Sequence, residues 1–339
     1  MKGDEVLLLL LLVQGARAYR VHAGRLRLPG GVGETTAACF SPGGDLACGT
    51  RKGGVVVLRM RDRRGLLVPG CLPGPVARLS FDGAWVAVSD GAAGLAFCCV
   101  AGQGDQAQQT LRRAAAPFNS VLFEVVAPGV LVCLSHTGRL DFLSLKGGGA
   151  VVNRAEVPTR SGLTAACLAG EGRVLVATDV GGALFVVELN PEEAALPPER
   201  WTPRVQALRK TGLRSGAECP RSVSVAFAPG GALEVTVGTN DGGLYSVRLQ
   251  KRYLHDNLSL YTCAPGAVTR HGFRAAGAVL SAKPLPRRRT ILVTGGEVHL
   301  FCPEEGHQLL QAGEVVDSHP PTSSFVVVGG GGLLIHRVV

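Results

Sequence analysis

The sequence predicts an all-β fold, a β-propeller of about seven four-stranded blades. One phrase, in which apolar strands alternate with tight turns, recurs seven times at intervals of about 40 to 60 residues, a period typical of propeller blades. Glycine accounts for 47 of the 339 residues without a collagen-like period, which indicates many tight turns. The hydrophobic fraction of 46% is ample for a large core, and the aromatic fraction of 5% means that Val, Leu and Ala must build it.

Each predicted repeat supplies three strands. The first copy contains AACFSPGGDLACGTRKGGVVVLRM, and the fifth reads VSVAFAPGGALEVTVGTNDGGLYSVRL. In most copies the two inner strands are strongly apolar, as expected of strands that are buried on both faces. In chain order the repeats are Thr36–Met60, Val76–Val100, Ser120–Leu145, Leu163–Leu189, Val223–Leu249, Ala278–Cys302 and Glu314–Val338.

The chain is expected to form one propeller domain over residues 1–339, with the seven repeats in 35–339 and closing strands in 1–34. The last repeat ends after its third strand, and Arg25–Leu28 is a candidate for the missing outer strand, because a ring closes by mixing its termini in one blade. Val6–Val13 is interpreted as a buried strand of an extra, partial N-terminal blade. The alternative is a signal peptide over residues 1–18, since Ala16-Arg17-Ala18 resembles a cleavage site.

The ten cysteines do not read as a disulfide framework or a metal site. Seven lie within predicted apolar strands, and no Cys-x-x-Cys pair or zinc-like spacing occurs. Buried structural cysteines favour a reducing compartment, so the chain is expected in the cytoplasm, with the secretory pathway as the alternative if residues 1–18 are a signal peptide. No cofactor or metal is predicted. No stretch reaches the ~18 apolar residues of a membrane span.

The phrases FSPGGDLACGTRKGGVVVLRM and FAPGGALEVTVGTNDGGLYSVRL resemble the WD40 repeat family, and Gly306-His307 stands where a repeat's Gly-His dipeptide would. No repeat carries the family's Trp-Asp pair, so the chain resembles a divergent member. The resemblance spans nearly the whole chain. It implies a non-enzymatic scaffold for protein–protein interactions within a multiprotein complex.

Basic loops are the candidate partner-binding elements, since loops carry function on rigid scaffolds. The longest insert, Asn190–Arg221, is cationic and contains one of the two tryptophans, and an arginine triplet falls in the first turn of the sixth repeat. With a net charge of +9, a propeller that binds RNA or the ribosome is an alternative, but the charges are dispersed and no aromatic platform for bases accompanies them. The candidate residues are Trp201, Arg204, Arg209, Lys210, Arg214, Arg287, Arg288 and Arg289.

The rival hypothesis is a secreted or luminal propeller, either an enzyme or a ligand-binding protein, with its site at the central channel. The first strand of each blade lines such a channel, and only Arg78, Glu124 and Asp317 are charged there. The eight histidines do not cluster, and His299 and His336 are expected to be half-buried strand residues. No catalytic motif was found, so we predict that the chain is not an enzyme.

Overall fold

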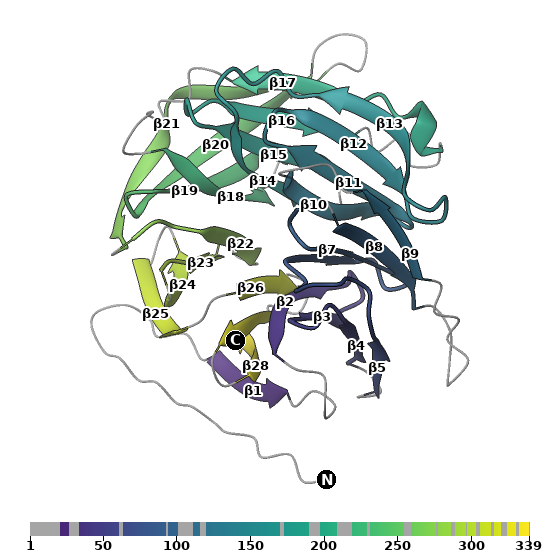
Figure 1. Ribbon diagram of the computed structural model, residues 1–339. Helices are drawn as coiled ribbons and strands as arrows, with labels where there is room; N and C mark the ends of the chain where they lie inside the picture. The colour runs from purple at the N-terminus through teal and green to yellow at the C-terminus, as the bar shows by residue number, and fades with distance from the viewer. Residues whose placement is uncertain are drawn as a thin grey trace. The chain divides into compact units, whose positions relative to one another are not determined.

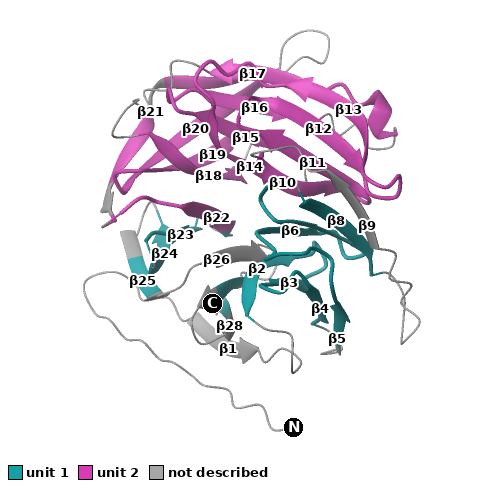
Figure 2. Ribbon diagram, in the orientation of Figure 1, with its two compact units in different colours: residues 1–116, 285–339 teal, residues 117–284 magenta. Residues whose placement is uncertain are grey.

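The strands that the structure describes pair into seven four-stranded sheets (Figure 1). In the computed structural model the chain divides into two compact units, Met1–Ala116 with Leu285–Val339 as unit 1 and Pro117–Pro284 as unit 2 (Figure 2). The structure describes residues 21–26, 34–60, 64–92, 94–100, 111–115, 120–169, 173–189, 197–208, 219–228, 231–253, 259–275, 277–285, 289–295, 297–302, 306–312, 315–319, 324–329 and 332–338.

In unit 1, each sheet contains four strands that are consecutive in the chain, apart from the sheet that joins the two ends. The inner strand β2 packs against β6 and against β26, which places their three sheets side by side. The first two sheets are β2 (Thr35–Phe40), β3 (Leu46–Thr50), β4 (Val55–Arg59) and β5 (Arg64–Val68), then β6 (Arg78–Phe81), β7 (Trp85–Ser89), β8 (Gly94–Cys99) and β9 (Leu111–Ala115). The other two are β22 (Ser281–Leu285), which contains the unit boundary, β23 (Arg289–Val293), β24 (Glu297–Cys302) and β25 (Gly306–Ala312), then β26 (Val315–His319), β27 (Ser324–Gly329), β28 (Gly332–Val338) and β1 (Val21–Leu26).

Unit 2 contains three sheets of consecutive strands, and its inner strand β14 packs against β10 and β18. The sheets are β10 (Ser120–Ala127), β11 (Val130–Ser135), β12 (Arg139–Ser144) and β13 (Ala150–Glu156); β14 (Leu163–Ala169), β15 (Val174–Asp179), β16 (Leu184–Glu188) and β17 (Arg204–Leu208); and β18 (Pro220–Phe227), β19 (Leu233–Thr239), β20 (Gly243–Tyr253) and β21 (Ser259–Arg274). Every predicted repeat therefore contains the first three strands of one sheet, and each sheet adds an outer fourth strand.

The sheet that contains β28 takes its outer strand from the N-terminal part of the chain. β1 pairs with β28 in antiparallel register from Val21↔Val338 to Leu26↔Leu333. This confirms the predicted strand exchange, although the strand begins four residues before Arg25. The predicted strand at Val6–Val13, the extra partial blade and the signal peptide lie outside the described residues.

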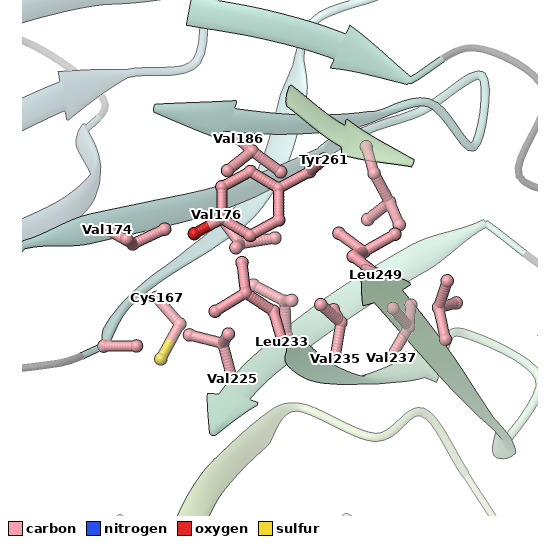
Figure 3. Close-up of a cluster of buried hydrophobic side chains, with 14 of the residues drawn as sticks. Cys167, Val174, Val176, Val186, Val225, Leu233, Val235, Val237, Leu249 and Tyr261 are labelled. Atoms are coloured by element: carbon pink, nitrogen blue, oxygen red, sulfur yellow. The ribbon is translucent and has the colours of Figure 1, made fainter. Parts of the chain in front are cut away.

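The core between neighbouring sheets of unit 2 is built mainly from valine and leucine, as the low aromatic content requires. Strands β14–β16 and β18–β20 face each other through side chains such as Val176 and Val235, both fully buried (Figure 3). Tyr261 of β21 covers this cluster and is 1% exposed. The side-chain amide of Gln206 on β17 pairs with the backbone of Tyr261: its Nε2 donates to the carbonyl oxygen, and its Oε1 accepts from the backbone N–H at 2.7 Å. This pairing ties the outer strands of two adjacent sheets together.

The turn between the second and third strands recurs with the same side-chain closure in four sheets. A hydroxyl or carboxylate oxygen at the end of the second strand accepts the backbone N–H four residues later, as Ser, Thr and Asp side chains do in turns. The bonds are Gly54 N to Thr50 Oγ1 (3.1 Å), Gly94 N to Asp90 Oδ1 (2.9 Å), Arg139 N to Ser135 Oγ (3.0 Å) and Ala183 N to Asp179 Oδ1 (2.9 Å).

The same turn fixes the connection into the next sheet. Gly53 and Gly138 occupy its last position with φ values of 76° and 95°, which favour glycine. Their carbonyl oxygens accept the backbone N–H groups of Leu72 and Val157 at 3.0 and 2.8 Å, in the segments that leave the outer strands. Because the two backbones are this close, an added Cβ at either glycine would overlap a carbonyl oxygen of that segment.

The interpretation of Asn190–Arg221 as an insert outside the blades is wrong. This segment contains β17, whose pairing runs from Leu184↔Leu208 to Glu188↔Arg204 and completes the β14–β17 sheet. The strand is short and begins after a proline-rich stretch, so its alternation is weak in the sequence. The Gly306-His307 dipeptide likewise lies in an outer strand. It begins β25, and His307 pairs with Phe301 of β24.

Candidate partner-binding surface

Trp201 is part of the core of unit 2. Its side chain is 7% exposed, and its ring meets Phe142 of β12 edge to face, with centroids 5.7 Å apart and an interplanar angle of 87°. It belongs to a buried cluster with Leu140 and Phe185. The expectation that Trp201 lies on a surface rather than in the core is therefore wrong, because an aromatic-poor core uses this indole to fill the space between two sheets.

A short 3₁₀ helix, η2 (Pro198–Arg200), holds Trp201 in place. Asn153 of β13 donates through Nδ2 to the carbonyl oxygens of Pro198 (2.9 Å) and Trp201 (2.6 Å). One half-buried amide thus fastens the segment between β16 and β17 onto the outer strand of the neighbouring sheet. Burial of the indole and this clamp together make the segment structural at its centre.

Exposed side chains surround the clamp and form what we call the β13–η2–β17 surface. Arg204, the first residue of β17, is exposed and engaged in an interaction of its own. The surface combines basic, acidic and polar groups, which is the composition expected of the rim of a protein interface. Its members are Glu199, Arg200, Thr202 and Arg204.

A buried carboxylate holds two arginines on the other face of the β10–β13 sheet, since Asp141 pairs with Arg154 while the next pair, Phe142 and Asn153, faces Trp201 and η2. Asp141 on β12 is 1% exposed and accepts from Nε of Arg139 at 2.8 Å and from Nε of Arg154 at 2.7 Å. Both arginine side chains are about half exposed, at 51% and 55%. Two guanidinium groups against one carboxylate leave one positive charge in excess, so the triad satisfies the buried acid and still presents a cation to solvent.

Most of the other predicted partner-binding residues are not described by the structure. Arg209, Lys210, Arg214, Arg287 and Arg288 lie outside the described residues. Arg289 opens β23 in unit 1 and is half-buried, with an interaction of its own. Their assignment to a partner surface therefore stays a prediction.

The charged residues predicted for the channel do lie on the first strands of their sheets. Arg78 opens β6, and Asp317 lies in the middle of β26, both in unit 1. Glu124 lies on β10 in unit 2. Arg78 and Glu124 are half-buried and are engaged in interactions.

The two strand histidines are more buried than predicted. His299 is 6% and His336 is 5% exposed. The His336 ring stacks on Phe325 with centroids 4.8 Å apart, and burial lowers its pKa to about 4, so the imidazole is neutral at pH 7. Both histidines are core residues of their sheets. Within the ranges that the structure describes, no group of three or more His, Cys, Asp or Glu side chains is placed to hold a metal ion.

The sequence did not predict one polar pair. Ser246 of β20 and His271 of β21 face each other, with Oγ and Nε2 at 2.7 Å, and burial lowers the pKa of His271. The pair joins two adjacent strands of one sheet and satisfies two half-buried polar groups. Nothing in the sequence could have found it, because the residues are 25 positions apart across a bulged hairpin. No helix among the described residues is long and apolar enough to cross a bilayer.

No protein-family model and no curated protein matches the chain in sequence. Its structure is similar to the β-propeller domain of Cps50 (Swd1) from Myceliophteria thermophila, with a TM-score of 0.60 and 14% identity, over 93% of this chain and 98% of that chain. The chain has a WD40-like β-propeller fold. The predicted all-β propeller with four-stranded blades is thereby confirmed, and so is the resemblance to divergent WD40-like propellers, at the level of the fold.

Proposed function

We propose that the protein is a non-enzymatic scaffold that binds other proteins within a multiprotein complex. The observation that carries the proposal is the WD40-like propeller fold, matched over nearly the whole length of the chain. A propeller of this kind offers rigid blades whose turns and outer strands vary without disturbing the core, and such surfaces suit several partners at once. The buried, neutral His336 and the structural Ser246–His271 pair agree with this assignment, since each has a packing role in its own sheet.

The scaffold is proposed to be a single domain in which the seven sheets are the blades of one ring. Two observations support this: inner strands pack on one another within each unit, and β1 completes the last sheet from the other end of the chain. A strand exchange of that kind is how a propeller removes the free edge of its final blade.

The proposed compartment is the cytoplasm. All ten cysteines are free thiols in the structure, and six of them are buried. Thiols placed among Val, Leu and Ala are typical of proteins that work where glutathione keeps cysteine reduced.

We propose that the basic segment after η2 contributes to a partner interface at the β13–η2–β17 surface. Arg204 is exposed there, and Arg209, Lys210 and Arg214 follow it within ten residues of the sequence. Clustered arginines attract an acidic protein surface and speed its association.

The test replaces Arg204, Arg209, Lys210 and Arg214 with Ser in one variant. Exposed charges contribute little to stability, so the free energy of unfolding is expected to change by less than about 1 kcal/mol. Affinity purification from cells followed by quantitative mass spectrometry is expected to recover a stoichiometric partner set with the wild type and at least threefold less of one partner with the variant. The difference between wild type and variant should shrink as salt is raised, because salt screens the charges that only the wild type carries.

A matched control carries the same loss of four charges at exposed positions elsewhere, Lys52, Arg160, Arg173 and Arg248. It is expected to retain all partners. Equal losses of bound partner in both variants would mean that net charge alone matters. If the wild type recovers no stoichiometric partner, the scaffold proposal itself is contradicted.

A further inference from the structure

The third and fourth strands of the β18–β21 sheet extend beyond its inner strands. β20 has 11 residues, whereas the third strands of the other two sheets of unit 2, β12 and β16, have 6 and 5. The pairing of β20 with β19 ends at Leu233↔Leu249, while its pairing with β21 continues to Tyr253↔Ser259. Residues 250–253 and 259–262 therefore form a two-stranded extension, which we call the β20–β21 ribbon.

One face of the ribbon is fastened to the β14–β17 sheet. The Lys251 Nζ lies 2.8 Å from Oε1 of Glu188 on β16, and these side chains are only 23% and 14% exposed. Tyr261 is opposite Lys251 on β21, and it is the buried residue whose backbone pairs with the Gln206 amide of β17. A two-stranded hairpin alone is marginally stable in water, so these contacts give the ribbon a fixed shape.

The opposite face of the ribbon is exposed. Successive side chains of a strand point to opposite faces, so Gln250 and Arg252 are directed away from the β14–β17 sheet, as is Leu260, which lies directly across from Arg252. All three side chains are exposed, and Leu260 is 41% exposed. Arg252 forms no ion pair with any residue that the structure describes. Arg248, which precedes the ribbon on the same face, has Glu234 of β19 opposite it.

We propose that this exposed face of the β20–β21 ribbon docks an acidic, extended segment of a partner protein. The proposal rests on the scaffold function and adds an interface separate from the β13–η2–β17 surface. The Arg252 guanidinium matches the geometry of a carboxylate, and Leu260 beside it offers an apolar contact. Residues i and i+2 of an extended segment share one face about 7 Å apart, so a Glu two residues from a Leu contacts both side chains.

The composition of this face favours a protein partner over a nucleic acid. Arg252 is the one cation among the described side chains of the exposed ribbon face, whereas tight binding to a phosphate backbone needs several cations. Its neighbour Leu260 is aliphatic, and bases are bound by stacking on aromatic side chains. Because the other face already holds the ribbon in place, docking requires little further ordering of the backbone.

The experiment measures the binding of labelled probes to the purified full-length protein by fluorescence anisotropy, at low ionic strength so that ion pairs are little screened. The probes are an octapeptide that repeats Glu-Glu-Leu-Leu, its Lys-Lys-Leu-Leu and Glu-Glu-Ser-Ser counterparts, and oligouridine RNA. The wild type is compared with the double variant Arg252→Ser, Leu260→Ser and with Arg252→Glu. The control double variant Arg173→Ser, Leu309→Ser removes an exposed arginine and an exposed leucine elsewhere.

The Glu-Glu-Leu-Leu peptide is expected to bind the wild type and the control equally, and the Arg252→Ser, Leu260→Ser variant about tenfold more weakly, since one ion pair and one apolar contact are lost. Arg252→Glu should instead prefer the Lys-Lys-Leu-Leu peptide.

The proposal is overturned if the wild type does not bind the acidic peptide, or if the Arg252→Ser, Leu260→Ser variant or the Ser-containing peptide binds equally well. Tighter binding of oligouridine, lost in that variant, would overturn it by assigning the face to nucleic acid. Because the probes are synthetic, a failure here leaves the scaffold proposal, which the cellular partners test, untouched.

Discussion

Gly138→Ala is expected to lower the free energy of unfolding by more than about 3 kcal/mol. Gly138 has a φ of 95°, which an L side chain rarely adopts. Its new Cβ would overlap the carbonyl oxygen of Val157, and the hydrogen bond from Val157 N to Gly138 O at 2.8 Å would be strained. Urea unfolding followed by circular dichroism gives the free energy directly.

Gly162→Ala is the matched control for this prediction. Gly162 also has a positive φ, of 83°, but the nearest atom to its added Cβ is the carbonyl oxygen of His136 at 3.8 Å, an ordinary contact. Only the conformational penalty of about 1–2 kcal/mol remains. Equal losses at the two positions would mean that backbone conformation alone matters and that the turn does not fix the connection between sheets.

Trp201→Ala is expected to lower the free energy of unfolding by about 3–5 kcal/mol, the usual range for removing a large buried aromatic side chain. The change removes the edge-to-face contact with Phe142 and leaves a cavity between the β10–β13 and β14–β17 sheets. Arg204→Ala, three residues later and exposed, should stay within about 0.5 kcal/mol of the wild type. The same urea titration measures both. If Trp201→Ala is as stable as Arg204→Ala, the indole is not a core side chain, and the prediction that Trp201 lies on a partner surface would be supported.

The repeating pattern predicted the first three strands of every sheet, because those strands are buried and their Gly-rich turns are explicit in the sequence. Outer strands were harder to predict from the sequence. β17 is only half-buried on both faces: Val205 and Ala207 pack on one apolar cluster and Leu208 on the other, so the five residues lack the strong apolar pattern of an inner strand. The pairing of β1 with β28 was predictable from topology, since the last repeat lacked a strand that a closed propeller needs.

The candidate site was less predictable than the fold. Trp201 follows prolines and precedes arginines, which suggests a loop, and only Phe142 and the Asn153 clamp explain why it is buried. The Gln206–Tyr261 clamp joins residues 55 positions apart in the sequence, and the Asp141 triad joins side chains of two neighbouring strands, β12 and β13. A pattern read along the chain carries no signal for such contacts. The four turn-closing side chains did have a signal in the sequence, because a Ser, Thr or Asp stands at the end of each of those second strands.

The claim that all seven sheets belong to one ring is tested most directly by unfolding each unit under its own probe. The chain contains two tryptophans, Trp85 on β7 in unit 1 and Trp201 in unit 2. Urea titrations of Trp201→Phe and Trp85→Phe, with fluorescence excited at about 295 nm, report one unit each, and circular dichroism of the same samples reports both. For a single ring, the fluorescence and circular dichroism transitions of each variant coincide in midpoint and slope. Fluorescence transitions that separate from the circular dichroism transition, with one unit unfolding while the other stays folded, would show two independent domains and contradict the account.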